Sequence, residues 1–181
     1  MRKHNLFVLI IAIVVATLFL GVYAATGGAK GDFARTTIDI GIVVSDVEKA
    51  AKFYKDALGF TEVPGFDVSK EMGRDSGLTD SRAFHVRVFV VSDEPTATKI
   101  KLMDFPDAPG KMVDNKFIHS SLGVRYLTVF VSDTNAAVER AKKAGVAPVK
   151  EPYQLGGGNN YLTLLRDPDG NIIELVGPKK N

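Results

Sequence analysis

The side chains that could do chemistry in this chain stand on short apolar segments and not in one continuous motif. Two carboxylates, Asp39 and Glu174, interrupt runs of isoleucine and valine, and Lys101 and Tyr126 interrupt two similar runs. A carboxylate in such a partly dry environment can move a proton or bind a hard cation. An ammonium group beside it can instead balance its charge. The choice between these chemistries depends on whether the fold brings the four side chains together.

A fifth apolar segment, residues 82–91, carries two more candidates, His85 and Arg87. The segment alternates in type, which is typical of a half-buried strand with two different faces. His85 could act as a base or a substitute metal ligand, and Arg87 could bind an anionic ligand. A strand histidine or arginine is more often a polar residue on the less buried face, so the structural interpretation stays open beside the functional one. Both residues are retained as candidates for the cleft.

The segments that position these candidates form an internal repeat. The stretch 36–60, TTIDIGIVVSDVEKAAKFYKDALGF, recurs as RYLTVFVSDTNAAVERAKKAGV. Ser45 and Ser132 are separated by 87 residues, and Asp46 and Asp133 share that offset. Several further pairs also share it, which indicates a repeat of whole structural units.

Each copy begins with an apolar strand and continues as an amphipathic helix. Ser45 and Asp46 end the first strand and can cap the helix that follows, and Glu48 stands at capping-box spacing from Ser45. Gly59 is expected to end this helix in the left-handed conformation. One apolar stripe should face the sheet, and it comprises Val47, Ala50, Ala51, Tyr54 and Leu58.

Three more strands complete each copy, so the pattern predicts two βαβββ modules. The further strands are expected at residues 61–68, 82–91, 99–105, 148–155, 161–166 and 172–176. Pro64 and Gly65 indicate a bulge or an edge position in the first of these. The fold class is therefore α+β, with modules at 36–106 and 123–178 inside a domain at 33–178. The modules should pair into a half-open barrel with outer helices and an inner cleft.

Strand parity predicts which residues face the cleft. If Ile40 and its alternate neighbours point to the helix, then Asp39 points the other way, and Tyr126 does so in the second copy. Lys101 and Glu174 occupy equivalent positions in the two closing strands, each followed by leucine. All four are predicted to face the cleft.

These features together resemble the vicinal oxygen chelate superfamily, which includes glyoxalase I, bleomycin-resistance proteins and extradiol dioxygenases. The matching motifs are VSDVEKAAKFYKDALGF in the first module, and VSD, a helix ending in AGV and LLRDPDGNIIEL in the second. The resemblance covers roughly residues 36–178. It implies the same paired-module fold, and it implies a homodimer as a further partner, since members often pair.

The resemblance also implies where a metal would bind. In metal-dependent members, a histidine or glutamine stands seven residues before the Asp of each VSD-like segment, and a glutamate stands in each closing strand. Those positions carry Asp39, Tyr126, Lys101 and Glu174 here, and only Glu174 keeps the family's residue type. Lys101 brings a positive charge to the place of the ion. We therefore expect no metal cofactor; if a divalent metal binds, Glu174 and Asp39 would hold it.

Three functions remain open from the sequence. The first is a module that binds a small molecule in the cleft without a metal, as bleomycin-resistance proteins do. The second is a metal-dependent enzyme, a lyase, epimerase or dioxygenase, with Glu174 as the best catalytic candidate. The third is a structural or interaction protein with a vestigial cleft. The altered residue set at the metal positions favours the first.

Composition excludes several other classes. The net charge of +2 is small and the basic residues are mixed with acidic ones, so nucleic acid is not an expected partner. The chain has no cysteine, which excludes disulfides, thiolate metal sites, a cysteine nucleophile and a lipid-modified cysteine.

The N-terminus has the pattern of a membrane-directing segment. Residues 6–25 are twenty uncharged residues rich in Ile, Val and Leu, preceded by Arg2 and Lys3 and followed by a Gly-rich spacer that ends near residue 30. Such a run is long enough to cross a bilayer as a helix, with its basic end in the cytoplasm. We expect a membrane-anchored domain outside the cytoplasm, or a secreted or periplasmic one if cleavage follows Ala24.

Overall fold

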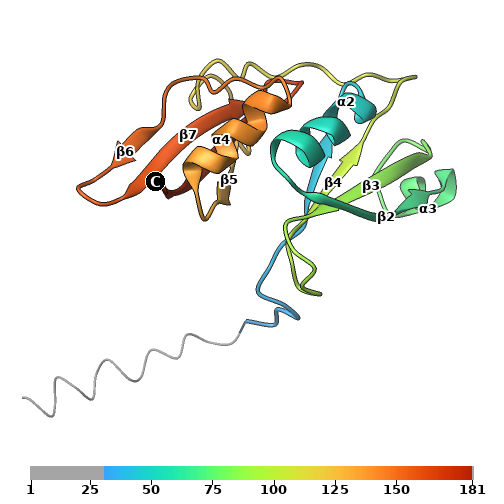
Figure 1. Ribbon diagram of the computed structural model, residues 1–181. Helices are drawn as coiled ribbons and strands as arrows, with labels where there is room; N and C mark the ends of the chain where they lie inside the picture. The colour runs from blue at the N-terminus through green and yellow to red at the C-terminus, as the bar shows by residue number, and fades with distance from the viewer. Residues whose placement is uncertain (1–30, 181) are drawn as a thin grey trace, which may run out of the picture. The chain divides into compact units, whose positions relative to one another are not determined.

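Two four-stranded sheets, each with helices on one face, make up residues 31–180, the part of the chain that this computed structural model describes (Figure 1). The first sheet has the strand order β1-β4-β3-β2 and the second β5-β8-β7-β6. The strands are β1 Ile40–Val43, β2 Thr61–Val68, β3 Phe84–Val90, β4 Lys99–Met103, β5 Tyr126–Phe130, β6 Tyr153–Leu155, β7 Asn160–Arg166 and β8 Ile172–Pro178. The equivalent orders confirm the repeat and the α+β class, and the described strands form two separate sheets and no closed barrel.

In the described part of the chain, four short helical segments accompany the strands. They are α2 Val47–Lys52, the π-helical turn η1 Phe53–Ala57, α3 Lys70–Asp75 and α4 Thr134–Lys143. In both modules the first and last strands pair in parallel, β1 with β4 and β5 with β8, while the remaining pairs are antiparallel. Residues from Thr37 onward form one compact unit.

The first helix begins after Asp46, one of the two residues expected to cap it. Asp46 is the N-cap, and its carboxylate accepts a hydrogen bond from the Lys49 backbone N–H at 3.0 Å. The backbone N–H of Ser45 donates instead to Asp169 Oδ2, also at 3.0 Å. The expected capping box between Ser45 and Glu48 is therefore wrong, because the turn after β7 supplies the acceptor for Ser45.

The end of this helix buries more than the predicted stripe. Because the helix widens into a π-helical turn, Phe53 and Ala57 are buried in addition to Tyr54 and Leu58. Gly59 then adopts the left-handed conformation with φ +78°, as predicted for the helix end.

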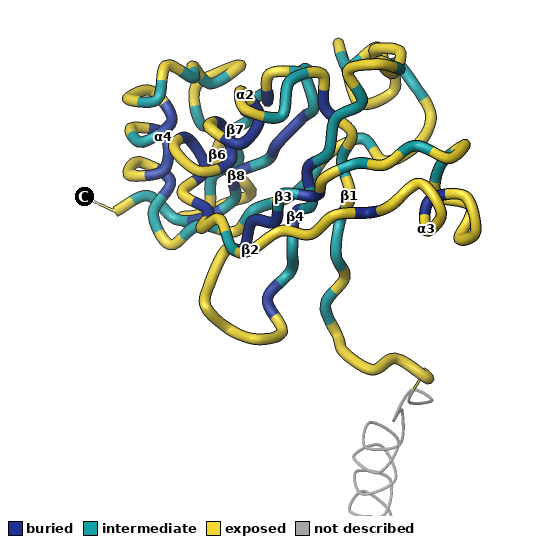
Figure 2. Tube along the Cα trace, turned by 90° about the vertical axis from the view of Figure 1, so that its right-hand side faces the viewer, coloured by how far each residue is buried: buried dark blue, intermediate teal, exposed yellow. Residues whose placement is uncertain are grey.

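One main hydrophobic core lies between the helices of both modules and the sheet faces that these helices cover. Its fully buried members include Phe89 and Leu102 from the first sheet and Ile173 and Leu175 from the second. Figure 2 shows these buried stretches on the strands and on one side of α4, while much of β2 is exposed. Burial of such side chains contributes about 1.5–3 kcal/mol each to folding.

Arg140 of α4 ties the two modules together. Its guanidinium donates to the carbonyl oxygens of Ala57 and Leu58 at 3.1 and 2.8 Å. These carbonyls end the first helix and would otherwise lack an intrahelical partner. The second module thus caps the helix of the first.

The bulge predicted in the second strand is present. The register between β2 and β3 shifts between Val63 and Phe66, which spans Pro64 and Gly65. A Cβ at Gly65 would lie 2.1 Å from the Val86 carbonyl oxygen, so only glycine permits this approach. The prediction of a bulge at Pro64 and Gly65 is therefore confirmed.

The predictions for the N-terminal segment, residues 1–30, lie outside the described residues. Within residues 31–180, no helix has the length and apolar character needed to span a membrane. The membrane segment at 6–25 and the cleavage after Ala24 therefore stay predictions.

Candidate functional site

Lys101 and Asp39 form an ion pair on the face of the first sheet that points away from the helices. The Lys101 ammonium lies 2.9 Å from Asp39 Oδ2, and the Asp39 side chain is only 15% exposed. Lys101 is in register with Gly41 of β1, which has no side chain to separate the pair. Its neighbours Ile100 and Leu102 point to the other face and lie in the core. Strand alternation thus directs the charged group outward from the core.

The second sheet has an equivalent polar pair in Thr128 and Glu174. These residues are in register between β5 and β8, and the Thr128 hydroxyl donates to Glu174 Oε2 at 2.8 Å. Ile173 and Leu175 on either side of Glu174 are fully buried on the opposite face. Sequence reasoning did not identify Thr128 as the partner of Glu174, although its alternation with Tyr126 along one strand was the available signal.

Aromatic side chains accompany these polar groups. Tyr126 is in register with Ile172 and is therefore on the same face of its sheet as Glu174, with 46% of its surface exposed. Phe66, which the bulge in β2 positions, has its ring centroid 6.0 Å from the Lys101 ammonium nitrogen. This distance allows a weak cation–π attraction. Sequence reasoning did not single out Phe66, because only the register shift brings it beside Lys101.

The structure does not bring His85 and Arg87 to this face. Arg87 is in register with Leu102, so it shares the helix side of the first sheet. It binds Glu62 through Nε at 2.7 Å and Glu48 of α2 through Nη1 at 2.8 Å. His85 Nδ1 lies 2.7 Å from Asp67 on the same side. Their placement in the cleft is therefore corrected: both lie on the helix side of the sheet, where Arg87 forms ion pairs with two glutamates and His85 forms a hydrogen bond with Asp67.

The pKa shifts of Arg87 and Glu62 agree with a strong ion pair between them. The hydrogen bonds from Arg87 hold the pKa of Glu62 below its usual value, despite the opposing effect of partial burial. The same bonds raise the pKa of Arg87, which stays charged. An arginine held by two carboxylates is poorly placed to recruit an anionic ligand.

The two modules face each other along β1 and β5. A pocket of about 260 Å³ lies between these strands and is lined by Gly41, Val43, Tyr126 and Ile172, among others. All four belong to the faces that carry the polar pairs. Of the four predicted cleft residues, Tyr126 lines this pocket. Lys101 and Glu174 stand on the corresponding faces of β4 and β8, the strands that pair with β1 and β5, and Asp39 directly precedes β1.

Comparison with known proteins identifies the family. The model of the Glyoxalase/Bleomycin resistance protein/Dioxygenase superfamily matches residues 37–175. The chain belongs to this superfamily. That membership confirms the resemblance to the vicinal oxygen chelate proteins and accounts for the paired modules.

Individual relatives of this superfamily domain are distant. A probable lactoylglutathione lyase from Vibrio cholerae is 24% identical over 137 residues, which cover 76% of this chain and 86% of that protein. A lactoylglutathione lyase from Neisseria meningitidis is 26% identical over 136 residues, with coverage of 75% and 86%.

Solved structures show the same fold. A glyoxalase family protein from Bacillus cereus superposes with a TM-score of 0.68 at 24% identity, covering 84% of this chain and 99% of that one. Glyoxalase I from Zea mays gives a TM-score of 0.60 at 18% identity, covering 81% and 46%.

The residues present do not fit the divalent metal that many superfamily members hold. A lysine side chain cannot bind a metal while it is protonated, because an ammonium has no lone pair. The Lys101 ammonium instead pairs with the carboxylate of Asp39, one of the two acidic residues at the metal positions. Within residues 31–180, no group of three or more His, Cys, Asp or Glu side chains is arranged to hold a metal ion. Lys101 therefore stands, as an ammonium, at one of the four positions that carry ligands in metal-dependent members.

Proposed function

We propose that this superfamily domain binds a small polar molecule in the cleft between β1 and β5 without a metal ion. The observation that carries the proposal is the 2.9 Å ion pair between Lys101 and Asp39, which occupy two of the four positions that carry ligands in metal-dependent members. Lys101 balances the charge of the Asp39 carboxylate. Glu174 accepts one hydrogen bond from Thr128 and can accept more, since a carboxylate has about four acceptor sites. A ligand with hydrogen-bond donors suits Glu174, and Tyr126 offers an aromatic surface.

Such a site can orient a ligand but supplies no Lewis acid. An ammonium carries one charge and three donors, compared with the two charges of a divalent ion. It holds Asp39 in place and forms hydrogen bonds, but it cannot activate a water molecule as a metal does. Binding is therefore better supported than metal-assisted catalysis.

The alternative is a metal-dependent lyase. The names of the two curated relatives, both lactoylglutathione lyases, favour this alternative, as does Glu174 at its family position. It requires that Lys101 leave the site or lose its proton.

One set of measurements tests the proposal against the alternative. The purified chain is dialysed against zinc, nickel or manganese, its metal content is measured, and lactoylglutathione lyase activity is assayed. We expect far less than stoichiometric metal and no activity. A library of small polar molecules, screened by thermal shift, should give ligands whose effect is lost in Glu174→Gln. Stoichiometric metal that is lost in Glu174→Ala would overturn the proposal.

We also propose that the domain is held at a membrane, on the side away from the cytoplasm. The apolar run at 6–25 and the basic residues before it support this placement. The folded unit from Thr37 onward contains the complete pair of modules, so the segment before it is free to act as an anchor or signal.

A further inference from the structure

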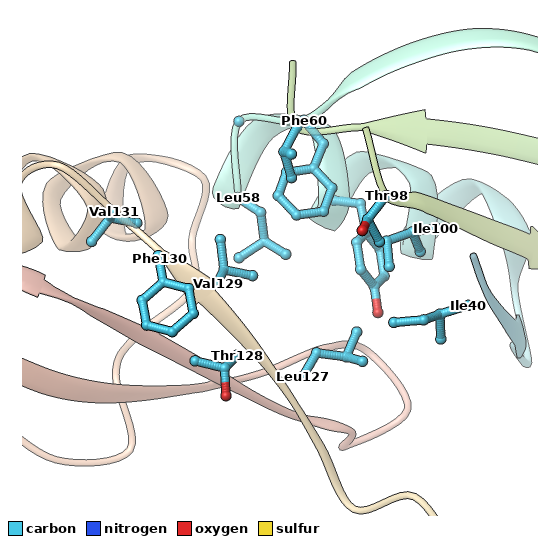
Figure 3. Close-up of a pocket in the computed structure, with 13 residues that line it drawn as sticks. Ile40, Leu58, Phe60, Thr98, Ile100, Leu127, Thr128, Val129, Phe130 and Val131 are labelled. Carbon is cyan, nitrogen blue, oxygen red and sulfur yellow. The ribbon is translucent and has the colours of Figure 1, made fainter. Parts of the chain in front are cut away.

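A second pocket lies between the modules, on the side where their helices pack. It has a volume of about 420 Å³, and its walls come from β1, β4 and the end of the first helix in one module and from β5 in the other. In Figure 3, Ile40 and Leu127 approach it from opposite sides, with Ile100 and Val129 beside them. Volumes of about 300–1,000 Å³ are typical of small-molecule sites.

The wall of this pocket carries no charged side chain. It consists of aliphatic and aromatic groups, and its polar side chains are those of Tyr54, Thr98 and Thr128. Burial, reinforced by the nearby Asp167 carboxylate, raises the pKa of Tyr54, so its phenol stays neutral. A charged ligand would lose its hydration here without gaining an ionic partner, which costs several kcal/mol.

Two apolar side chains at the pocket remain in contact with water. Phe130 is 80% exposed and Val91 is 55% exposed, although both line the pocket. Phe60 and Leu58, further along the same wall, are almost fully buried. A bound apolar molecule would cover the exposed pair at a gain of about 25 cal/mol per Å² of surface removed from water.

We propose that this pocket binds an uncharged, largely apolar small molecule. The site is distinct from the smaller pocket between β1 and β5: the two share Ile40 and Leu127, but the wall built from Tyr54 to Phe60 at the end of the first helix belongs to the larger pocket. Its ligand is selected by shape and by the absence of charge. The Thr128 hydroxyl already donates to Glu174, so the threonines offer at most weak orientation.

A matched pair of fluorescent probes tests the class of ligand. The neutral probe 1-N-phenylnaphthylamine and its charged relative 8-anilinonaphthalene-1-sulfonate have similar ring systems and differ in the sulfonate. Both are titrated into the full chain in detergent. We expect a saturable signal with the neutral probe and an affinity at least ~10-fold weaker for the sulfonate.

Substitutions locate the binding. Thr98→Trp should fill the pocket and weaken the neutral probe at least ~10-fold, whereas Thr96→Trp, on the exposed turn nearby, should not. Detergent background is the same for both variants, so their difference reports the pocket. Val91→Trp replaces Thr98→Trp if circular dichroism shows that the latter is unfolded.

The proposal is overturned if the two probes bind equally, or if the pocket-filling variant binds as well as the unmodified chain.

Discussion

The Lys101 ammonium and the Asp39 carboxylate form an ion pair between β4 and the start of β1, at 2.9 Å. Both side chains are partly shielded from water, with exposed fractions of 30% and 15%. The pair is formed across Gly41, which stands opposite Lys101 in the register. In the second module Glu174 is equivalent to Lys101 and Thr128 to Gly41, and these two residues are joined by a hydrogen bond. The Asp39 carboxylate is thus balanced by a cation, whereas the Glu174 carboxylate accepts from a neutral hydroxyl.

Replacing this cation by ligands should create a metal site. In the double variant Lys101→Glu with Tyr126→His, the four positions would offer three carboxylates and one imidazole, a set suited to a divalent transition metal. We expect this variant to bind about one zinc or nickel ion per chain, in a manner sensitive to chelators and to low pH. Isothermal titration and elemental analysis would measure it.

The control carries the same charge changes elsewhere. Lys111→Glu with Tyr153→His alters an exposed linker residue and an exposed residue of β6. It should bind no more metal than the unmodified chain. If both double variants bind metal equally, the four strand positions do not converge on one site.

Truncation of Leu58 should destabilise the domain. Leu58 is 4% exposed and belongs to the main core, so Leu58→Ala should lower the free energy of unfolding by about 2–5 kcal/mol. Leu122→Ala is the matched control, because Leu122 is 99% exposed and its truncation should change stability by less than about 0.5 kcal/mol. Urea denaturation followed by circular dichroism measures both. Similar losses in the two variants would contradict the assignment of Leu58 to the core.

A side chain at Gly59 should cost stability for two reasons. The residue has φ +78°, and a Cβ there would lie 3.0 Å from Arg140 Nε, which helps to cap the first helix. We expect Gly59→Ala to lose about 1–2 kcal/mol in chemical denaturation. Gly157→Ala, whose Cβ would meet no atom within 4 Å, should change stability by less than about 1 kcal/mol. The prediction fails if Gly59→Ala is as stable as the unmodified chain.

The bulge in β2 and the left-handed Gly59 were predictable because each depends on local backbone chemistry. Gly59 follows an apolar helical stripe, and Gly65 follows a proline inside a strand. Both signals arise within a few residues, where glycine has conformations that other residues avoid. The bounds of β2, Thr61–Val68, also agree with the strand expected at residues 61–68.

The acceptor for the backbone N–H of Ser45 and the face of Arg87 were not predictable from local chemistry. The acceptor for Ser45 is Asp169, which is 124 residues away in the sequence. Arg87 stands on a strand with apolar residues on both faces, Val88 on one and Phe89 on the other, so parity alone could not decide which face borders the cleft. Only the register with β4 and the contact with Glu48 decide it.

The ion pair of Arg87 with Glu62 should make stability depend on acidity. The pKa of Glu62 lies below 4.5, the ordinary value for a glutamate, because Arg87 donates hydrogen bonds to its carboxylate. The folded state therefore binds fewer protons than the unfolded state, so this stabilisation is present above about pH 4.5 and is lost as pH falls through the folded pKa. Denaturation across this range should show a smaller loss in Glu62→Gln than in the unmodified chain.

The matched control for that measurement is Glu94→Gln, on the exposed turn before β4. It should follow the unmodified chain at every pH. The raised pKa of the buried Asp167 acts in the opposite direction, but it is common to all three proteins and cancels in their differences. Identical pH profiles for Glu62→Gln and Glu94→Gln would show that the pair does not contribute.

The N-terminal segment should decide where the domain is found. A helix of the twenty residues 6–25 would be about 30 Å long, which matches the hydrocarbon thickness of a bilayer. The full chain should sediment with membranes and remain there after washes with high salt and with alkaline carbonate. A chain that begins at Phe33 should be soluble and should melt cooperatively, since the compact unit begins at Thr37.

Two further observations separate an anchor from a cleaved signal. Protease added to intact cells should degrade the domain if it lies outside the cytoplasmic membrane and is accessible, as the basic residues before the apolar run predict. N-terminal sequencing should find the uncleaved chain if the anchor is retained, and Ala25 if cleavage follows Ala24. Release of the full chain by salt alone, with its N-terminus intact, would contradict both forms of the prediction, because an inserted apolar helix is not displaced by screening of charge.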